Sequence, residues 1–177
     1  NRRPERADLA VSRGPVGNRH RGVRSLIRPI PFVAGTVQRT DIPRSLLGRY
    51  LVCRVTGNLV IGVANATIHS ESPLGLIRNM AIAINGSVKT LQSASGHGMF
   101  RLSHYVRRAQ SELTAPSNVV GTRAFAMTFL IDHESWRMGD PAETLFDGSR
   151  FTDVELTIQW GDAPDIATAG GGGTIAL

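Results

Sequence analysis

The sequence contains a single cysteine, Cys53, and a single lysine, Lys89, among its 177 residues. One cysteine excludes an internal disulfide framework and any zinc site built from several cysteines. No apolar run approaches the roughly 18 residues that a membrane-spanning helix needs. A chain of this length buries roughly 70% of its unfolded surface, so one core can hold it together without a disulfide or a metal.

Acidic side chains are also few, 14 against 20 basic ones, and aromatic side chains make up only 6% of the sequence. The basic excess lies in residues 1–28, which hold eight arginines and only two acidic residues. Residues 29–177 hold the other 12 basic and the other 12 acidic side chains, so their net charge is zero. The sequence therefore describes a basic arm on a neutral body.

Residues 1–31 are rich in proline and glycine and poor in large apolar groups, so they cannot bury enough surface to order themselves. We expect an extended, flexible arm that contacts nucleic acid or anionic lipid through arginine–phosphate pairs. The arm has no aromatic residue, which argues against base stacking. A solvated tail, or one that threads between neighbouring subunits, remains an alternative. The predicted contact residues are Arg2, Arg3, Arg6, Arg13, Arg19, Arg21, Arg24 and Arg28.

After the arm, alternating apolar and polar residues predict β-strands. Gly57-Asn58 interrupts this pattern, and Asn85-Gly86 predicts a hairpin because both residues tolerate positive φ. The strand expected at Arg123–His133 has apolar or small residues on both faces, so we expect both faces to be covered. The predicted strands are Thr36–Ile42, Tyr50–Thr56, Leu59–Val63, Met80–Ile84, Ser87–Leu91, Arg123–His133 and Asp153–Trp160.

Helices are few in this pattern. Residues 98–110 fit helical spacing at Met99 and Leu102 but also strand alternation at Phe100 and Leu102, and their length and the Arg107-Arg108 pair favour a helix. Pro141–Phe146 fits one helical turn. Many short strands without a βαβ rhythm predict an all-β fold, a jelly-roll sandwich with one or two short helices and an extended N-terminal arm. The expected division is an arm at 1–31, a jelly-roll domain at 32–165, and a segment at 166–177 that combines a glycine-rich linker with the possible start of a further strand or a second jelly roll.

No credible catalytic, cofactor or metal site is visible. His97 and His104 are two helical turns apart, but no carboxylate sits at ligand spacing, so surface or capping histidines are expected. The run Asp132-His133-Glu134-Ser135 holds triad-type residues, yet neighbours in a strand point to opposite faces. Cys53 lies among apolar residues and is interpreted as a small core residue rather than a nucleophile.

Three segments resemble parts of jelly-roll major capsid proteins of the PRD1-like lineage, which includes other membrane-containing phages. They are a Pro-x-x-Leu-Ile-Arg turn leading into a strand that ends in Asn-Gly, an early strand region, and the end of the first jelly roll. In this sequence they occupy Pro73–Ser87, Ile42–Gly57 and Thr157–Asp162.

This resemblance implies a structural protein of the virion that forms an icosahedral shell without catalysis. Its partners would be further copies of itself, in trimeric or pseudo-hexameric capsomers, other capsid proteins, and an internal membrane or genome reached through the arm. The length fits one jelly roll, either a single-jelly-roll type or the first half of a longer chain. A carbohydrate- or receptor-binding jelly-roll module is the main alternative, and a cupin-type enzyme is a weaker one because clustered histidines are missing.

Overall fold

The structure is a computed structural model that describes residues 29–44, 47–48, 50–107, 112–132 and 146–177. Twelve strands, one α-helix and three short 3-10 helices follow one another in this part of the chain. They are β1 (Val37–Asp41), β2 (Leu47–Gly48), β3 (Tyr50–Ile61), β4 (Thr67–Ile68), η1 (Leu74–Leu76), β5 (Ile77–Ile84), β6 (Lys89–Ala94), α1 (Gly96–Arg107), β7 (Leu113–Thr114), β8 (Gly121–Asp132), β9 (Phe146–Asp147), η3 (Gly148–Arg150), β10 (Val154–Trp160), η4 (Ala163–Asp165), β11 (Ala167–Thr168) and β12 (Ile175–Ala176).

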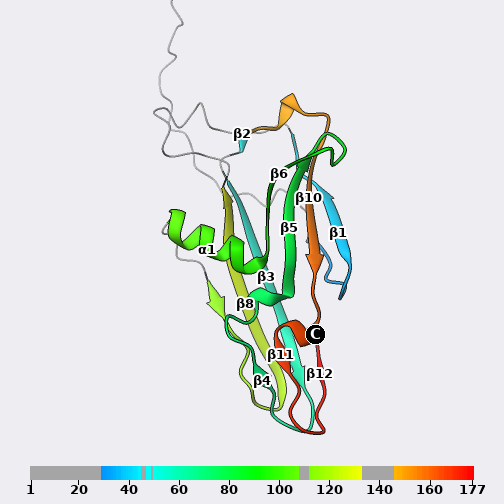
Figure 1. The fold of residues 1–177 in the computed structure, drawn as a ribbon, viewed down its shortest axis with the longest axis vertical. Helices are drawn as coiled ribbons and strands as arrows, with labels where there is room; N and C mark the ends of the chain where they lie inside the picture. Colours follow the sequence, from blue (N-terminus) through cyan, green and yellow to red (C-terminus); the bar gives the residue numbers. More distant parts are fainter. Residues whose placement is uncertain (1–28, 45–46, 49, 108–111, 133–145) are drawn as a thin grey trace, which may run out of the picture.

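Two four-stranded antiparallel sheets form the body, which is elongated along the strands (Figure 1). One sheet has the order β1-β10-β5-β6 and the other has the order β12-β3-β8-β7. The chain passes repeatedly from one sheet to the other, and β1 pairs with β10 although they are far apart in the sequence. This crossing pattern is that of a jelly-roll sandwich, as the sequence predicts.

The core lies between the two sheets and is built from alternate residues of their strands. Met80 and Ile82 of β5 and Leu156 of β10 face inward from one sheet, and Leu59 of β3 and Met127 of β8 face inward from the other; all are buried. The predicted period-2 pattern of Asp153–Trp160 is confirmed, because Val154, Leu156, Ile158 and Trp160 are all at most 4% exposed.

Strand β3 runs unbroken through Gly57-Asn58, so the predicted interruption is wrong. Gly57 lies directly opposite Phe125 of β8, and the Phe125 ring occupies the space above it. The glycine therefore belongs to the strand because an aromatic partner covers it. The prediction of two covered faces for β8 is also wrong in part, because Ala124 on its outer face is exposed.

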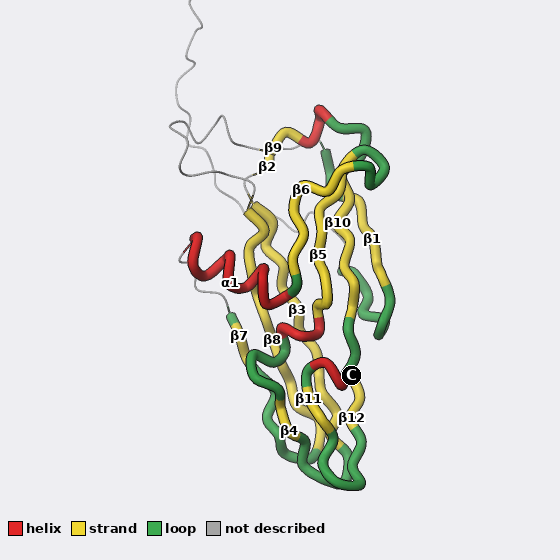
Figure 2. The backbone as a smooth tube through the Cα atoms, viewed as in Figure 1, coloured by secondary structure: helices red, strands yellow, loops and turns green. Residues whose placement is uncertain are grey.

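The predicted helix and hairpin are both present, with shifted bounds. Helix α1 starts at Gly96 and buries Met99 and Ser103. Leu102 is 45% exposed, so the prediction that it shares the inward face with Met99 is wrong. The return strand after Asn85-Gly86 begins at Lys89 rather than Ser87. Figure 2 shows α1 crossing beside β8 at an angle to the strands.

The C-terminal segment folds back onto the body. Strand β11 pairs with β4, and β12 pairs with the end of β3 through Ile175 opposite Ile61. The sequence predicts the possible start of a further strand within 166–177, and the structure has a two-residue strand there, Ile175–Ala176. The helical turn predicted over Pro141–Phe146 lies outside the described residues up to residue 145, and Phe146 begins β9. In the part of the chain that is described, no helix is long and apolar enough to cross a membrane.

Candidate functional site

The predicted arm contacts, Arg2 to Arg28, all lie outside the described residues, so their role stays a prediction. The division of the chain at residue 31 also stays a prediction, and His133 lies outside the described residues. What the structure offers instead is a set of polar clusters and surfaces on the body.

The described histidines lie apart from one another in separate contacts. His69 bridges the Asp165 carbonyl oxygen and the Thr168 hydroxyl, with ring-nitrogen distances of 3.2 and 2.9 Å. His104 lies stacked on Phe100, with ring centroids 6.4 Å apart. Among the described residues, no group of three or more His, Cys, Asp or Glu side chains could hold a metal ion.

Glu71 joins the turn before η1 to the first half of α1. Its carboxylate lies 2.7 Å from His97 Nδ1 and 2.9 Å from Arg101 Nη2. The hydrogen bonds from Arg101 and His97 hold the pKa of the Glu71 carboxyl below its ordinary value. The backbone of Glu71 has a φ of 62°, a left-handed conformation that is uncommon outside glycine, asparagine and aspartate. The cluster is exposed and fixes α1 on the body.

Cys53 is held in the sandwich, with its Sγ 4.0 Å from Met80 Sδ. Burial raises the pKa of this thiol to about 12, so it stays protonated and unreactive near neutral pH. This supports its interpretation as a core residue. Of the run Asp132-His133-Glu134-Ser135, only Asp132 falls within the described residues, where it ends β8.

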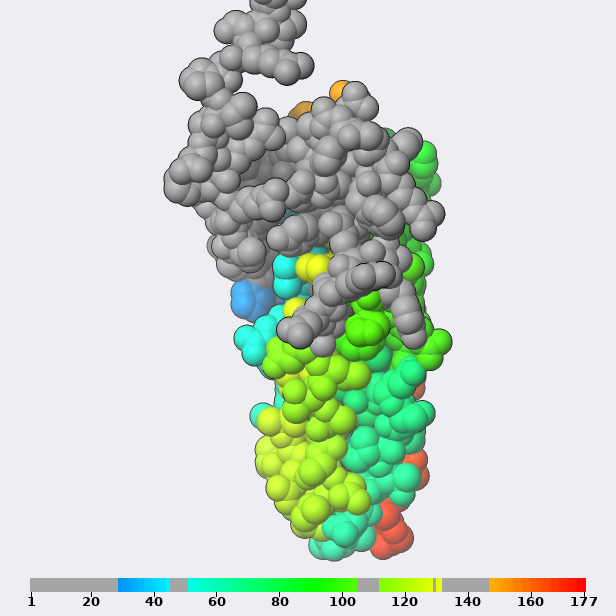
Figure 3. Space-filling view, turned by 90° about the vertical axis from the view of Figure 1, so that its left-hand side faces the viewer, coloured from blue at the N-terminus to red at the C-terminus, as the bar shows by residue number. Residues whose placement is uncertain are grey.

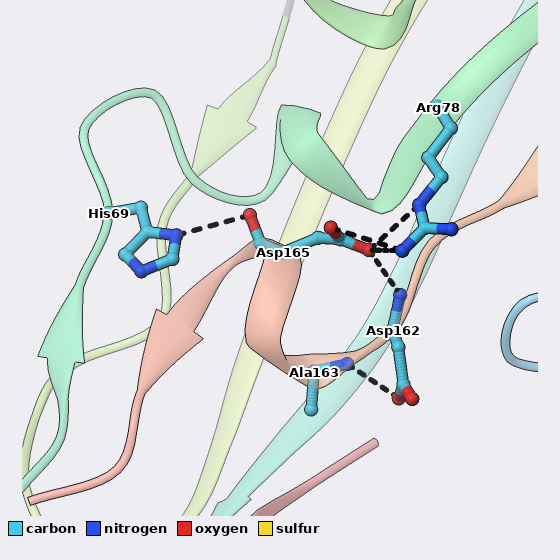
Figure 4. A network of polar contacts seen from close by, with 5 residues as sticks. All are labelled: His69, Arg78, Asp162, Ala163 and Asp165. Atoms are coloured by element: carbon cyan, nitrogen blue, oxygen red, sulfur yellow. Dashed lines mark hydrogen bonds and ion pairs between the residues drawn. The ribbon is translucent and has the colours of Figure 1, made fainter.

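A second polar network attaches the C-terminal segment to the start of β5 (Figure 4). The Arg78 guanidinium donates to the Asp165 carboxylate, with Nη2 3.0 Å and Nε 3.2 Å from Oδ2. The same Oδ2 accepts the Asp162 backbone N–H at 2.7 Å, and the Asp162 carboxylate caps η4 through the Ala163 N–H. Because His69 also contacts the Asp165 carbonyl oxygen, one residue is held from three sides.

The outer face of β3 and β8 is hollowed. The hollow has a volume of about 480 Å³ and is open to solvent. Small side chains make it, and the ion pair between Arg54 and Glu112 at 3.4 Å borders it. Its lining residues are Thr56, Gly57, Asn58, Glu112, Thr114, Ala124, Phe125 and Ala126.

One end of the body, which we call the uncharged end, is made by the loops 62–66, 117–121 and 169–174, none of which contains a charged residue. They meet at the lower end of Figure 3. Hydrogen bonds link them, from Ala66 N to the Asn118 carbonyl at 3.1 Å and from Gly62 N to the Thr174 carbonyl at 2.8 Å. These loops carry three exposed valines, Val63 at 86%, Val119 at 48% and Val120 at 40%. The loops themselves carry no charge, and the Arg123 guanidinium of β8 donates to the Val119 and Val120 carbonyl oxygens beside them.

Sequence reasoning did not find these features. Arg78 and Asp165 are 87 positions apart, and no local pattern pairs them. The uncharged end did carry a signal, because three turn segments without a single charge are visible in the sequence. Only the strand pairing shows that they lie together.

Comparison with known proteins places the fold. No family model and no curated protein matches the chain. The crystal structure of the STIV MCP, a viral major capsid protein, is similar with a TM-score of 0.62 and 22% identity, covering 83% of this chain and 42% of that chain. A chain in the atomic structure of Sulfolobus Turreted Icosahedral Virus is similar with a TM-score of 0.60 and 21% identity, covering 83% of this chain and 40% of that chain. The chain therefore spans less than half the length of these structures, and over most of its own length it has the all-β jelly-roll fold of viral capsid proteins.

Proposed function

We propose that this chain is a major capsid protein, or one jelly roll of such a protein, that forms the icosahedral shell of a virion. The observation that carries the proposal is the fold match over 83% of the chain to the STIV MCP. A shell subunit works through surfaces rather than through a catalytic pocket, and the proposal assigns the chain no enzymatic activity and no cofactor. The similar solved structures are structural proteins of a virus, which supports this reading.

The proposal extends to a place in the PRD1-like lineage and to trimeric or pseudo-hexameric capsomers. The 42% coverage of the STIV MCP is compatible with one jelly roll of a two-jelly-roll subunit or with a shorter single-jelly-roll type. The division into an arm at 1–31, a jelly roll at 32–165 and a following segment at 166–177 belongs to the same proposal. The arginine arm would contact neighbouring copies, an inner membrane or the genome.

The body is suited to contacts between protein copies. Residues 29–177 have no net charge, so like copies can approach without strong repulsion. The hollowed face and the uncharged end both present small or apolar groups, which protein interfaces favour over isolated charges. Nucleic acid or anionic lipid, by contrast, would need an excess of positive charge, and in this sequence the excess lies in the arm.

Assembly of the purified chain tests the proposal. Size-exclusion chromatography and negative-stain microscopy should show trimers or larger regular particles. A strictly monomeric protein that binds a glycan in an array would instead support the carbohydrate-binding module. Deleting residues 1–28 should abolish assembly or the retention of nucleic acid or lipid, whereas unchanged particles with unchanged contents would leave the arm without a role.

Two matched point variants probe the body separately from the arm. Val63 and Val88 are 86% and 85% exposed, so Val63→Asp and Val88→Asp should both fold normally. If the uncharged end is a contact between copies, Val63→Asp should lower the yield of particles, because a buried unpaired carboxylate is costly. Val88→Asp next to Lys89 provides the control for a new charge in an exposed turn. If both variants give the same yield of particles, the uncharged end does not take part in the contacts between copies.

A further inference from the structure

The turn between β5 and β6 contains Asn85-Gly86, the one Asn-Gly pair in the sequence. Asn-Gly is chemically labile because glycine has no side chain to hinder its backbone nitrogen. When that nitrogen loses its proton to hydroxide, it attacks Cγ of the asparagine. A C–N bond forms, the bond from Cγ to Nδ2 breaks, and ammonia leaves with a proton from water. Water then opens the resulting succinimide at either carbonyl and gives aspartate or isoaspartate.

Solvent can reach this turn freely, because Asn85 and Gly86 are both exposed. Burial therefore gives the pair no protection. The turn lies at the upper end of the β5–β6 hairpin in Figure 1, opposite the uncharged end.

Hydrogen bonds from the segment before β10 hold both reacting groups. The Gly86 N–H donates to the Asp153 carboxylate, with both oxygens 2.8 Å from the nitrogen. The Asn85 side-chain oxygen accepts the Thr152 N–H at 3.0 Å and the Thr152 hydroxyl at 3.1 Å. The Asn85 backbone N–H donates to the Asp153 carbonyl oxygen at 3.3 Å. The nucleophile and the carbon it must attack are thus both fixed by Thr152 and Asp153.

We propose that Thr152 and Asp153 form a latch that protects Asn85 from deamidation, and that Asn85 becomes a modification site when this latch opens. A carboxylate that accepts the Gly86 N–H opposes its deprotonation, because the anion would face a negative charge. The contacts from Thr152 hold the carboxamide, so Cγ does not swing toward the Gly86 nitrogen.

The product would damage the same turn. A carboxylate at position 85 stands beside Asp153 and near Glu155, which accepts the Ser87 hydroxyl at 2.8 Å, so like charges gather. Isoaspartate also routes the main chain through the former side chain and lengthens it between β5 and β6. The Val88 N–H to Asn85 carbonyl bond of 3.3 Å, which closes the turn, would then be lost.

Peptide mapping by mass spectrometry of the full chain, incubated at pH 8, measures the deamidation rate at Asn85. One sample is native and one is unfolded in urea. We expect deamidation of Asn85 in the native sample to be roughly ten- to a hundredfold slower than in the unfolded sample. Such a factor corresponds to the energy of one to two hydrogen bonds to a charged group. Equal rates in the native and unfolded samples would overturn the proposal, and this comparison needs no variant.

Variants identify the latch. Asp153→Ala should move the native rate toward the unfolded one, Asp153→Asn should lie between, and Thr152→Val should accelerate deamidation more weakly. Glu112→Ala, which removes an exposed carboxylate just before β7 of the other sheet, should match the unaltered protein. Cooperative unfolding by circular dichroism confirms that each variant folds, and the milder Asp153→Asn and Thr152→Val replace Asp153→Ala if it does not. If every folded variant of Thr152 and Asp153 deamidates at the unaltered rate, these two residues do not protect Asn85 and the proposal is wrong.

Discussion

Phe125 lies across Gly57 of the neighbouring strand, so that a Cβ atom on Gly57 would come within 2.5 Å of Cζ of the ring. The two residues are paired in the antiparallel register of β3 and β8, and Phe125 is only 4% exposed. The ring fills the place of the missing side chain. β3 continues through Gly57 over its twelve residues, and Phe125 belongs to the buried core.

Gly57→Ala should destabilise the protein by about 1–3 kcal/mol, because the new methyl group forces the buried Phe125 ring out of position. Chemical denaturation monitored by circular dichroism measures the loss. Gly171→Ala is the control, since nothing lies within 4 Å of its added Cβ. Combining Gly57→Ala with Phe125→Leu should cost less than the sum of the two single changes. Strict additivity would show that the ring contact is not the cause.

Asp165→Ala should loosen the C-terminal segment and lower the free energy of unfolding by about 1–2 kcal/mol, since it removes a partly exposed ion pair and an acceptor for the Asp162 N–H. Asp165→Asn keeps an acceptor and should cost less. Hydrogen exchange should rise in β11 and β12 while β5 and β10 stay protected. Arg54→Ala, which breaks an exposed pair with Glu112, is the control and should leave β11 and β12 unchanged.

Glu71→Gln should reduce stability at pH 7 and make a smaller difference at pH 3. The folded-state pKa of Glu71 lies below its ordinary value of 4.5, so its contribution is fully present above that value and is lost as the pH falls through the folded pKa. Urea midpoints of the two proteins at both pH values measure this. The comparison between them is needed because the pKa of Asp147 is also lowered, by hydrogen bonds from Ser149 and by Arg150, so the unaltered protein weakens in acid for that reason too. A gap between the proteins that is as large at pH 3 as at pH 7 would contradict the assignment.

Cys53 should react with iodoacetamide only slowly in the native protein at pH 8, because burial raises its thiol pKa to about 12 and the thiolate is the reactive form. The labelling rate should rise steeply when urea unfolds the chain. Mass spectrometry follows the reaction. Labelling that is equally fast with and without urea would show that the thiol is not enclosed in the sandwich.

Local patterns in the sequence were enough to predict the strands that have one buried and one exposed face. Residues 153–160 alternate without exception, and β10 follows them within one residue. The prediction of a break at Gly57-Asn58 failed because the reason for that glycine is a partner 68 positions away. The return strand after Asn85-Gly86 starts late because Gly86 and Ser87 both have positive φ, so the turn uses two further residues.

The sequence predicts the fold more completely than it predicts the polar networks and surfaces of the body. The arm is predicted from charge alone and stays a prediction, whereas the network around Asp165 depends on β5, η4 and the turn after β4 meeting in space. The resemblance to capsid proteins depended on segments in a particular order. The fold match to viral capsid structures supports that resemblance at the level of architecture.

The glycines of residues 170–173 suggest a loose tether, but the segment is fitted closely to the body. A Cβ on Gly170 would collide with the Asn65 backbone, and one on Gly173 would crowd Ala64. After this turn the chain runs back along the end of β3, so that the C mark in Figure 1 lies on the lower half of the body, above its lower end. A tag or label fused to Leu177 would therefore emerge from the flank of the sandwich beside β3, in a fixed direction. It would not emerge from the end where the glycines lie.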